Sequence, residues 1–180
     1  AFLGRLHPTK GPDVLVQAMQ QLSVVDIELH MFGIVQPGDE PYAGRLRDLA
    51  DRDPRIIFEQ ALPSHEVIDV LQTFDAVAVP SQWLETGPLV VLEAFAAQAP
   101  VVGSRLGGIA ELVRNGVDGL LVQYDSVTDW ARALRLLAED RALLQRLREQ
   151  VRAPRGMQAV CDDMQSVYAS VISGSPAVAA

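Results

Sequence analysis

The sequence has a single cysteine, Cys161, among its 180 residues. One thiol cannot form a disulfide within the chain, and a metal site built from several cysteines is excluded. The sequence also lacks any run of 18 or more apolar residues, the length that a membrane-spanning helix requires. Neither a disulfide-stapled module nor a transmembrane helix is therefore predicted within these residues.

Basic residues are scarce as well, with 15 Lys and Arg against 23 Asp and Glu and a net charge of −8. An acidic chain does not attract nucleic acid or an anionic membrane through its overall field. Any anionic ligand must therefore be held by a few local groups. The remaining composition, 49% hydrophobic and 21% charged, is ordinary for a globular domain, and the length suffices for one sizeable core.

Short apolar runs alternate with stretches of helical periodicity, which predicts an α/β fold. The expected architecture is a Rossmann-like, three-layer domain with a parallel sheet of about six strands. Ser64 is the predicted N-cap of one helix, and Ser126 or Asp125 that of another. Expected strands are 1–3, 27–32, 56–58, 76–79, 101–103 and 119–122, and expected helices are 13–22, 42–51, 66–73, 88–98, 126–138, 140–152 and 157–172, with a short one beginning at Glu111.

The stretch from Pro80 to Gly108 follows an expected strand and carries two glutamates eight positions apart, Glu85 and Glu93. Pro88 marks a helix start, where an N–H would be unpaired anyway. Ligands of open α/β sheets bind beyond the carboxyl ends of the strands, and helix N-termini attract phosphate. Glu93 lies about 7.5 Å along that helix from Pro88, at 1.5 Å per residue. The pattern therefore predicts a diphosphate at the helix start, with each glutamate reaching a sugar on one side. Taken alone, two glutamates at this spacing are more often a solvated helix residue and a loop charge, and the surrounding motifs decide between the two interpretations.

The stretch resembles the donor-binding half of retaining GT-B glycosyltransferases of the large group 1 (GT4-like) family. The resemblance covers residues 3–135 approximately. It rests on E-x7-E followed by alanine at Glu85–Ala94, PVV at Pro100–Val102, GG-x-x-E at Gly107–Glu111, NG-x-x-G-L-L-V at Asn115–Val122 and GRL-x-x-x-KG at Gly4–Gly11.

This resemblance implies transfer of a sugar from a nucleotide-diphosphate sugar to an acceptor, with retention at the anomeric carbon. It implies that Arg5 and Lys10 bind the diphosphate, that Glu93 binds the ribose and that Glu85 binds the transferred sugar. No metal or other cofactor is expected, since cations and the helix dipole take that place. The D-x-D at Asp51–Asp53 is interpreted as a solvated helix end. The expected catalytic residues are Glu85, Arg5 and Lys10, and the expected substrate-binding residues are Glu93, Gly87, Pro88, Leu89, Val90, Gly107 and Gly108, the last two in a glycine-rich loop at 104–109.

Three positions depart from the family pattern. Gln60 stands where a glycine usually follows, the loop from Gly33 to Pro41 lacks a closely following second glycine, and Pro88 replaces a frequent glycine. In the family, the region around Gln60 normally approaches the nucleotide base, so the base is not predicted. Pro88 is expected to remove one free N–H donor from the phosphate site.

The chain begins inside an expected strand without methionine, and we expect a fragment that lacks an N-terminal acceptor domain. Residues 1–172 are the expected donor-binding domain and residues 173–180 a flexible tail. The helix at 157–172 either crosses onto the missing domain or packs on its own. Alone, the chain is expected to bind donor without transferring sugar. The expected location is cytoplasmic, or peripheral at a membrane through the missing domain.

Two other functions are compatible with parts of this pattern. One is half of a GT-B sugar-nucleotide epimerase. The other is a non-catalytic nucleotide-binding α/β module, such as a flavodoxin-like receiver. A receiver needs an acidic cluster and a phosphorylatable aspartate at the strand ends, whereas these loops carry Arg5, Lys10 and glycines.

Overall fold

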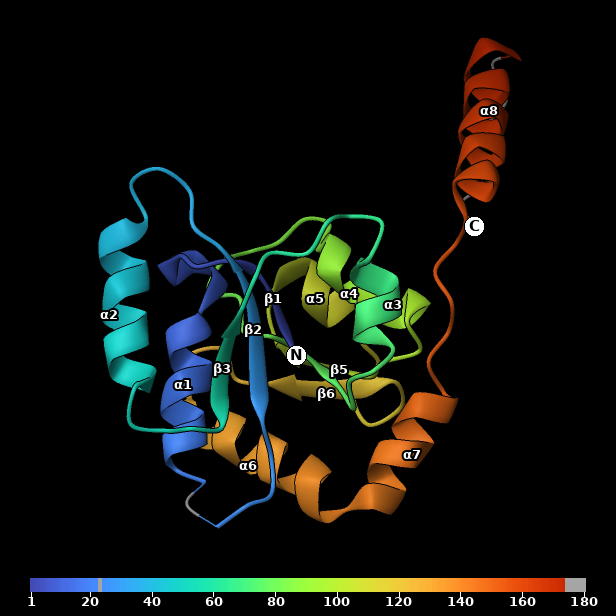
Figure 1. The fold of residues 1–180 in the computed structure, drawn as a ribbon. Helices are drawn as coiled ribbons and strands as arrows, with labels where there is room; N and C mark the ends of the chain where they lie inside the picture. Colours follow the sequence, from blue (N-terminus) through green and yellow to red (C-terminus); the bar gives the residue numbers. More distant parts are fainter. Residues whose placement is uncertain (23, 174–180) are drawn as a thin grey trace.

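The computed structural model describes residues 1–22 and 24–173. Its centre is one parallel sheet with the strand order β3-β2-β1-β4-β5-β6 (Figure 1). The six-stranded Rossmann-like fold expected from the sequence is thus confirmed. The strands are β1 (Phe2–Arg5), β2 (Leu29–Ile34), β3 (Ile56–Glu59), β4 (Val77–Val79), β5 (Val101–Ser104) and β6 (Gly119–Val122).

Helices cover both faces of the sheet, so the domain has three layers. One hydrophobic cluster joins the sheet to α1, α2, α6 and α7, and a second joins it to α3, α4 and α5. Neighbouring residues of β4 serve opposite clusters: Ala78 belongs to the first, Val77 and Val79 to the second. The helices are η1 (Pro8–Lys10), α1 (Pro12–Gln20), α2 (Glu40–Ala50), α3 (Val67–Leu71), α4 (Leu89–Ala96), α5 (Gly107–Leu112), α6 (Val127–Glu139), α7 (Arg141–Glu149) and α8 (Met157–Ser173).

The strand order reverses between β1 and β4. The chain first adds β2 and β3 on one side of β1, then returns and adds β4, β5 and β6 on the other. The loops after β1 and β4 therefore diverge to opposite sides and leave a crevice at the carboxyl edge of the sheet. This crevice is the position at which an open α/β sheet binds a ligand.

Most expected helices and strands are present with shifted ends. Of the two predicted helix caps, one is confirmed and one is wrong. Ser126 caps α6 as predicted, because its hydroxyl accepts the N–H of Asp129 at 3.2 Å. The predicted cap at Ser64 is wrong: α3 follows Glu66, and no side chain caps it. The prediction of a glycine-rich loop at 104–109 is also wrong in part, since α5 begins at Gly107. Glu111, expected to begin this helix, lies near its end.

Asp53 is not the solvated helix end that the sequence suggested. Its carboxylate is buried and accepts hydrogen bonds from the Arg55 guanidinium, whose Nη2 lies 2.6 Å from Oδ2. The same guanidinium donates to the carbonyl oxygen of Met19 at 2.9 Å, at the end of α1. Asp53 therefore orients an arginine that joins α1 to the start of β3.

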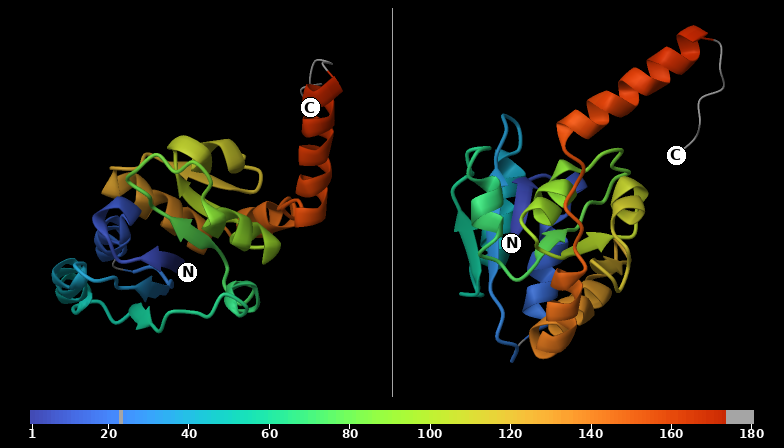
Figure 2. Two further views of the ribbon diagram at one scale, coloured as in Figure 1. Left: turned by 90° about the horizontal axis from the view of Figure 1, so that it is seen from above. Right: turned by 90° about the vertical axis from the view of Figure 1, so that its right-hand side faces the viewer.

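Helix α8 stands away from the rest of the domain, as both views in Figure 2 show. None of its residues is buried, and the last buried residue of the body is Val151. The alternative that this helix packs on its own domain is therefore wrong for the described structure. Of the expected tail, Ser173 closes α8, and residues 174–180 lie outside the described residues.

Candidate functional site

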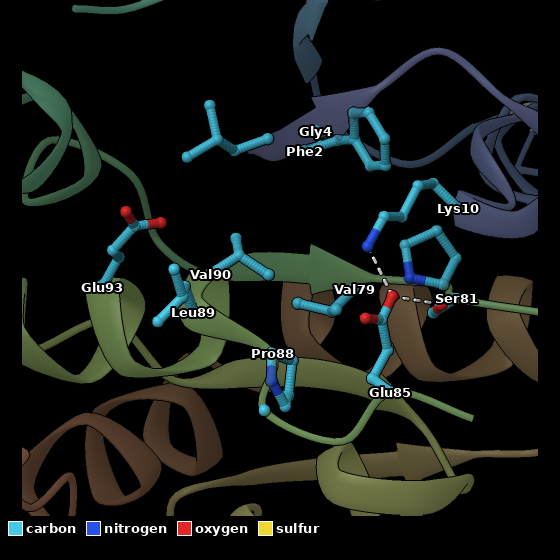
Figure 3. A pocket seen from close by; sticks show the side chains of 13 residues that line it. Phe2, Gly4, Lys10, Val79, Ser81, Glu85, Pro88, Leu89, Val90 and Glu93 are labelled. Carbon is cyan, nitrogen blue, oxygen red and sulfur yellow. Dashed lines mark hydrogen bonds and ion pairs between the residues drawn. The ribbon is translucent and has the colours of Figure 1, made fainter. Parts of the chain in front are cut away.

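A cavity of about 330 Å³ occupies the crevice between the loops that follow β1 and β4 (Figure 3). Seven of the ten predicted site residues line it, which places both loops and the start of α4 around one space. The lining consists of Phe2, Leu3, Gly4, Lys10, Val79, Pro80, Ser81, Glu85, Gly87, Pro88, Leu89, Val90 and Glu93.

An ion pair joins the two loops across this cavity. The ammonium of Lys10 lies 2.5 Å from Oε1 of Glu85, and the Ser81 hydroxyl lies 2.8 Å from the same oxygen. Burial alone would raise the pKa of Glu85, but the bonds from Lys10 and Ser81 bring it below its ordinary value. Glu85 is thus an anion at neutral pH, held through one of its two oxygens.

Close backbone contact fixes the two loops against each other. Gly11 has φ 63°, and a Cβ at this position would lie 2.1 Å from the carbonyl oxygen of Pro80. The backbone N–H of Gln82 donates to the Thr9 carbonyl at 2.8 Å. Only glycine permits this approach, and the approach brings Lys10 and Glu85 within reach of each other.

Helix α4 starts at the floor of the cavity. Pro88 is its N-cap rather than its first residue, and the Val91 N–H closes the first turn on the Pro88 carbonyl at 3.0 Å. The N–H groups of Leu89 and Val90 precede that closure and have no acceptor within the helix. Pro88 lies before the first helical residue, so the N–H that it lacks is that of the N-cap. The loss of one donor from the phosphate site stays a prediction. The N–H groups of Leu89 and Val90 and the helix dipole favour an anion here.

Glu93 lies one turn further along α4, at the opposite end of the cavity from Lys10 and Glu85 (Figure 3). Its side chain is half-buried, and this burial raises the pKa of its carboxyl above the ordinary value. Among the described residues no side-chain hydrogen bond or ion pair engages Glu93. A ligand that donates hydroxyl groups would offset that desolvation.

Arg5 lies outside the cavity lining. Its guanidinium makes a two-bond fork with Asp39, in which Nη2 lies 2.8 Å from Oδ1 and Nε bonds Oδ2. This fork lowers the pKa of Asp39 and raises that of Arg5. Asp39 is buried at the start of α2, in the loop after β2. Sequence reasoning missed it, because its contact with Arg5 depends on β1 and β2 being neighbours.

Gly107 and Gly108 also lie outside the lining and support the Glu85 loop from behind. The Gly108 N–H donates to the Glu85 carbonyl at 2.6 Å, and a Cβ on Gly108 would lie 2.7 Å from that oxygen. The expectation that this N–H approaches a ligand is therefore wrong for Gly108. Sequence reasoning also missed Ser81, which had one signal: it lies two residues after the end of a buried strand.

Two absences concern the described residues alone. Among them, no three His, Cys, Asp or Glu side chains gather as a metal site would require. Within residues 1–22 and 24–173, no helix is both long and apolar enough to cross a membrane. The expectation of a metal-independent site stays a prediction.

The sequence matches the model of the glycosyl transferases group 1 family over residues 1–153. It is 38% identical over 148 residues to the D-inositol 3-phosphate glycosyltransferase of Stackebrandtia nassauensis, covering 77% of this chain and 33% of the relative. It is 34% identical to D-inositol 3-phosphate glycosyltransferase 1 of Catenulispora acidiphila, covering 96% and 44%. The chain thus spans about a third to less than half of the length of these relatives.

Solved structures share the fold. Sucrose-phosphate synthase from Thermosynechococcus elongatus superposes with a TM-score of 0.80 at 26% identity, covering 97% of this chain and 46% of that one. Anabaena HepE in complex with UDP superposes with a TM-score of 0.76 at 24% identity, covering 83% and 42%. The second likeness shows the fold alone.

Proposed function

The chain belongs to the group 1 family of glycosyl transferases, and we propose that it forms the donor-binding half of such an enzyme. The whole enzyme would move a sugar from a nucleotide-diphosphate sugar to an acceptor, with retention of configuration. The observation that carries this proposal is the cavity between β1 and β4, which gathers Lys10, Glu85, the start of α4 and Glu93.

The diphosphate binds where Lys10 faces the first turn of α4. Lys10 supplies a point charge with three donors, and the N–H groups of Leu89 and Val90 supply oriented dipoles. The acidic chain offers no general attraction, so these local groups carry the phosphate affinity. Arg5 follows the lining residue Gly4 and contributes from there. Asp39 engages its Nε and Nη2, and no acceptor among the described residues engages Nη1, which is therefore offered to an anion.

The two glutamates bind sugars on either side of the diphosphate. Glu93, half-buried and without a partner among the described side chains, accepts hydrogen bonds from the ribose hydroxyls. Glu85, at the other end of the cavity, accepts hydroxyls of the transferred sugar. The order ribose, diphosphate, sugar then follows the cavity from Glu93 to Glu85 (Figure 3).

The chemical step is departure of the nucleoside diphosphate from the anomeric carbon. Negative charge grows on the β-phosphate as that bond breaks, and Lys10 and the N–H groups of α4 stabilise it more strongly in the transition state than in the donor. In this proposal Lys10 and the N–H groups of α4 stabilise the charge without a metal ion. The acceptor binds a second domain that completes the enzyme, in the cytoplasm or at its membrane surface.

The relatives suggest the first probe. Anabaena HepE has been solved in complex with UDP and, in another structure, with UDP-glucose. Uridine diphosphate is therefore tested before guanosine and adenosine diphosphates. The two relatives described above are named D-inositol 3-phosphate glycosyltransferases, so inositol 3-phosphate is the first acceptor to test in a two-domain enzyme.

The proposal is tested by calorimetric titration of the 180-residue chain. Wild-type chain should bind one of the three nucleoside diphosphates more tightly than the matching nucleoside. Lys10→Ala should weaken the diphosphate by about 1.5–3 kcal/mol and leave the nucleoside unchanged. Arg132→Ala, which removes an exposed cation of α6, is the control and should change neither. A folded wild-type chain that binds none of the three would refute the proposal.

A further inference from the structure

The cation of the cavity already has an anionic partner within the chain. Lys10 Nζ lies 2.5 Å from Glu85 Oε1, while the second oxygen of Glu85 has no hydrogen-bond partner among the described residues. Both side chains are partly shielded, with exposed fractions of 39% for Lys10 and 21% for Glu85. The group proposed to bind phosphate and the group proposed to bind the transferred sugar therefore neutralise each other.

From this contact we infer that Glu85 competes with the donor's diphosphate for Lys10. The competition makes the cavity discriminate between a nucleotide sugar and the nucleoside diphosphate that remains after transfer. The inference rests on the proposed function and deepens it, because it assigns the same site a means of favouring substrate over product.

A nucleotide sugar and a nucleoside diphosphate differ in the hydrogen-bond donors that they offer to Glu85. When Lys10 turns to a diphosphate, Glu85 keeps only the Ser81 hydroxyl, which is itself shared with the Thr9 carbonyl at 3.0 Å. A nucleotide sugar brings sugar hydroxyls that bond Glu85 in place of Lys10. A nucleoside diphosphate brings none, so it leaves a shielded carboxylate short of partners, which is unfavourable.

The structure also indicates which partner moves. The Glu85 backbone is fixed by the Gly108 N–H at 2.6 Å and by the close packing of Gly107 and Gly108. Lys10, in contrast, carries its charge on a flexible four-carbon stem and has two further N–H donors. Lys10 therefore exchanges between Glu85 and phosphate, and after sugar transfer its return to Glu85 promotes release of the product.

The test compares UDP with UDP-glucose, or the guanosine or adenosine pair if wild type binds that base more tightly. Glu85→Gln keeps the size of the side chain and its acceptor for Ser81, but removes the charge that holds Lys10. It should bind UDP roughly two- to fivefold more tightly than wild type, the range of partly exposed ion pairs. The preference for UDP-glucose over UDP should shrink. Glu85→Ala is measured beside it, so that the result does not depend on one variant folding.

Two further variants decide whether the gain comes through Lys10. In a Lys10→Ala background, Glu85→Gln should produce no gain in UDP affinity. Glu93→Gln makes the same chemical change at the far end of the cavity and should not strengthen UDP binding. A gain that persists without Lys10, or a Glu85→Gln variant that binds UDP more weakly, would overturn the inference while leaving the proposed function intact. A wild-type chain that binds no nucleoside diphosphate would overturn both.

Discussion

The N–H of Gly108 donates to the carbonyl oxygen of Glu85 at 2.6 Å, so the start of α5 supports the loop that carries the carboxylate proposed to bind the transferred sugar. A Cβ at residue 108 would lie 2.7 Å from that oxygen and 3.1 Å from Cδ of Pro88. The two glycines of the GG-x-x-E motif thus act on the site through the backbone of Glu85.

Gly108→Ala should therefore displace Glu85. Overpacking of this kind costs about 1–3 kcal/mol of stability. We expect UDP-glucose binding to weaken more than UDP binding, because only UDP-glucose brings sugar hydroxyls that bond Glu85. Gly44→Ala is the matched control: nothing lies within 4 Å of the added methyl group, and the change should stabilise α2 by up to about 1 kcal/mol. Equal weakening of both ligands by Gly108→Ala would contradict a role confined to Glu85.

Asp39 should contribute stability through Arg5 in a pH-dependent way. The fork from Arg5 lowers the pKa of Asp39, so the ion pair stabilises the fold above the carboxyl's unfolded pKa of about 3.9. This contribution is lost as the pH falls through the lower, folded value. Asp39→Asn should thus reduce the melting temperature at neutral pH, and the difference from wild type should narrow in acid. Asp48→Asn, an exposed position on the same helix, should show no such trend. A pH-independent loss at Asp39 would argue against the ion pair.

Glu93 should affect the pH dependence of stability in the opposite direction to Asp39. Burial raises its pKa, so ionisation of this carboxyl destabilises the folded chain as the pH rises through the folded value. Glu93→Gln should therefore raise the melting temperature at neutral pH, with the gain disappearing below about pH 4, where both states are protonated. The same variant should weaken UDP but leave its 2′,3′-dideoxy analogue unchanged. If the analogue loses as much affinity as UDP, Glu93 does not contact the ribose.

A strained residue, Gln98, follows the C-cap of helix α4. Gln98 has φ 56°, the left-handed region that glycine adopts without penalty. Gln98→Gly should stabilise the chain by about 0.5–1 kcal/mol, since relief of about 1–2 kcal/mol is partly offset by the freedom of glycine in the unfolded state. Gln98→Ala keeps the Cβ and should give no gain in denaturant unfolding. A similar gain from both would place the effect in the side chain.

The chain alone should bind donor without transferring sugar. Every role proposed for a residue of the cavity is in donor binding, and alignment with an acceptor can supply about 7–11 kcal/mol of barrier reduction that a single half does not provide. Radiolabelled UDP-glucose incubated with the chain and inositol 3-phosphate should give only background transfer. A two-domain relative serves as the positive control. Transfer by the chain near the rate of that relative would contradict the two-half interpretation.

Sequence reasoning recovered the fold, which depends on local pattern, and placed seven of its ten candidate site residues at the cavity, from their positions after strands together with the family resemblance. The order of strands and helices follows from periodicity, and Glu85, Glu93 and Lys10 stand at fixed distances from strand ends. It failed where a contact joins distant segments. Asp39 reaches Arg5 because β1 and β2 are neighbours. The Gly108 N–H donates to the Glu85 carbonyl because α5 lies behind the loop after β4. Neither contact is visible along the chain.

A crystal structure of the chain with UDP tests the central claim most directly. The account predicts the diphosphate within hydrogen-bond distance of Lys10 Nζ and the N–H groups of Leu89 and Val90, with the ribose hydroxyls on Glu93. Lys10 should then have moved from Glu85. UDP bound outside the β1–β4 crevice, or within it with its ribose at Glu85 and its diphosphate at Glu93, would contradict the account.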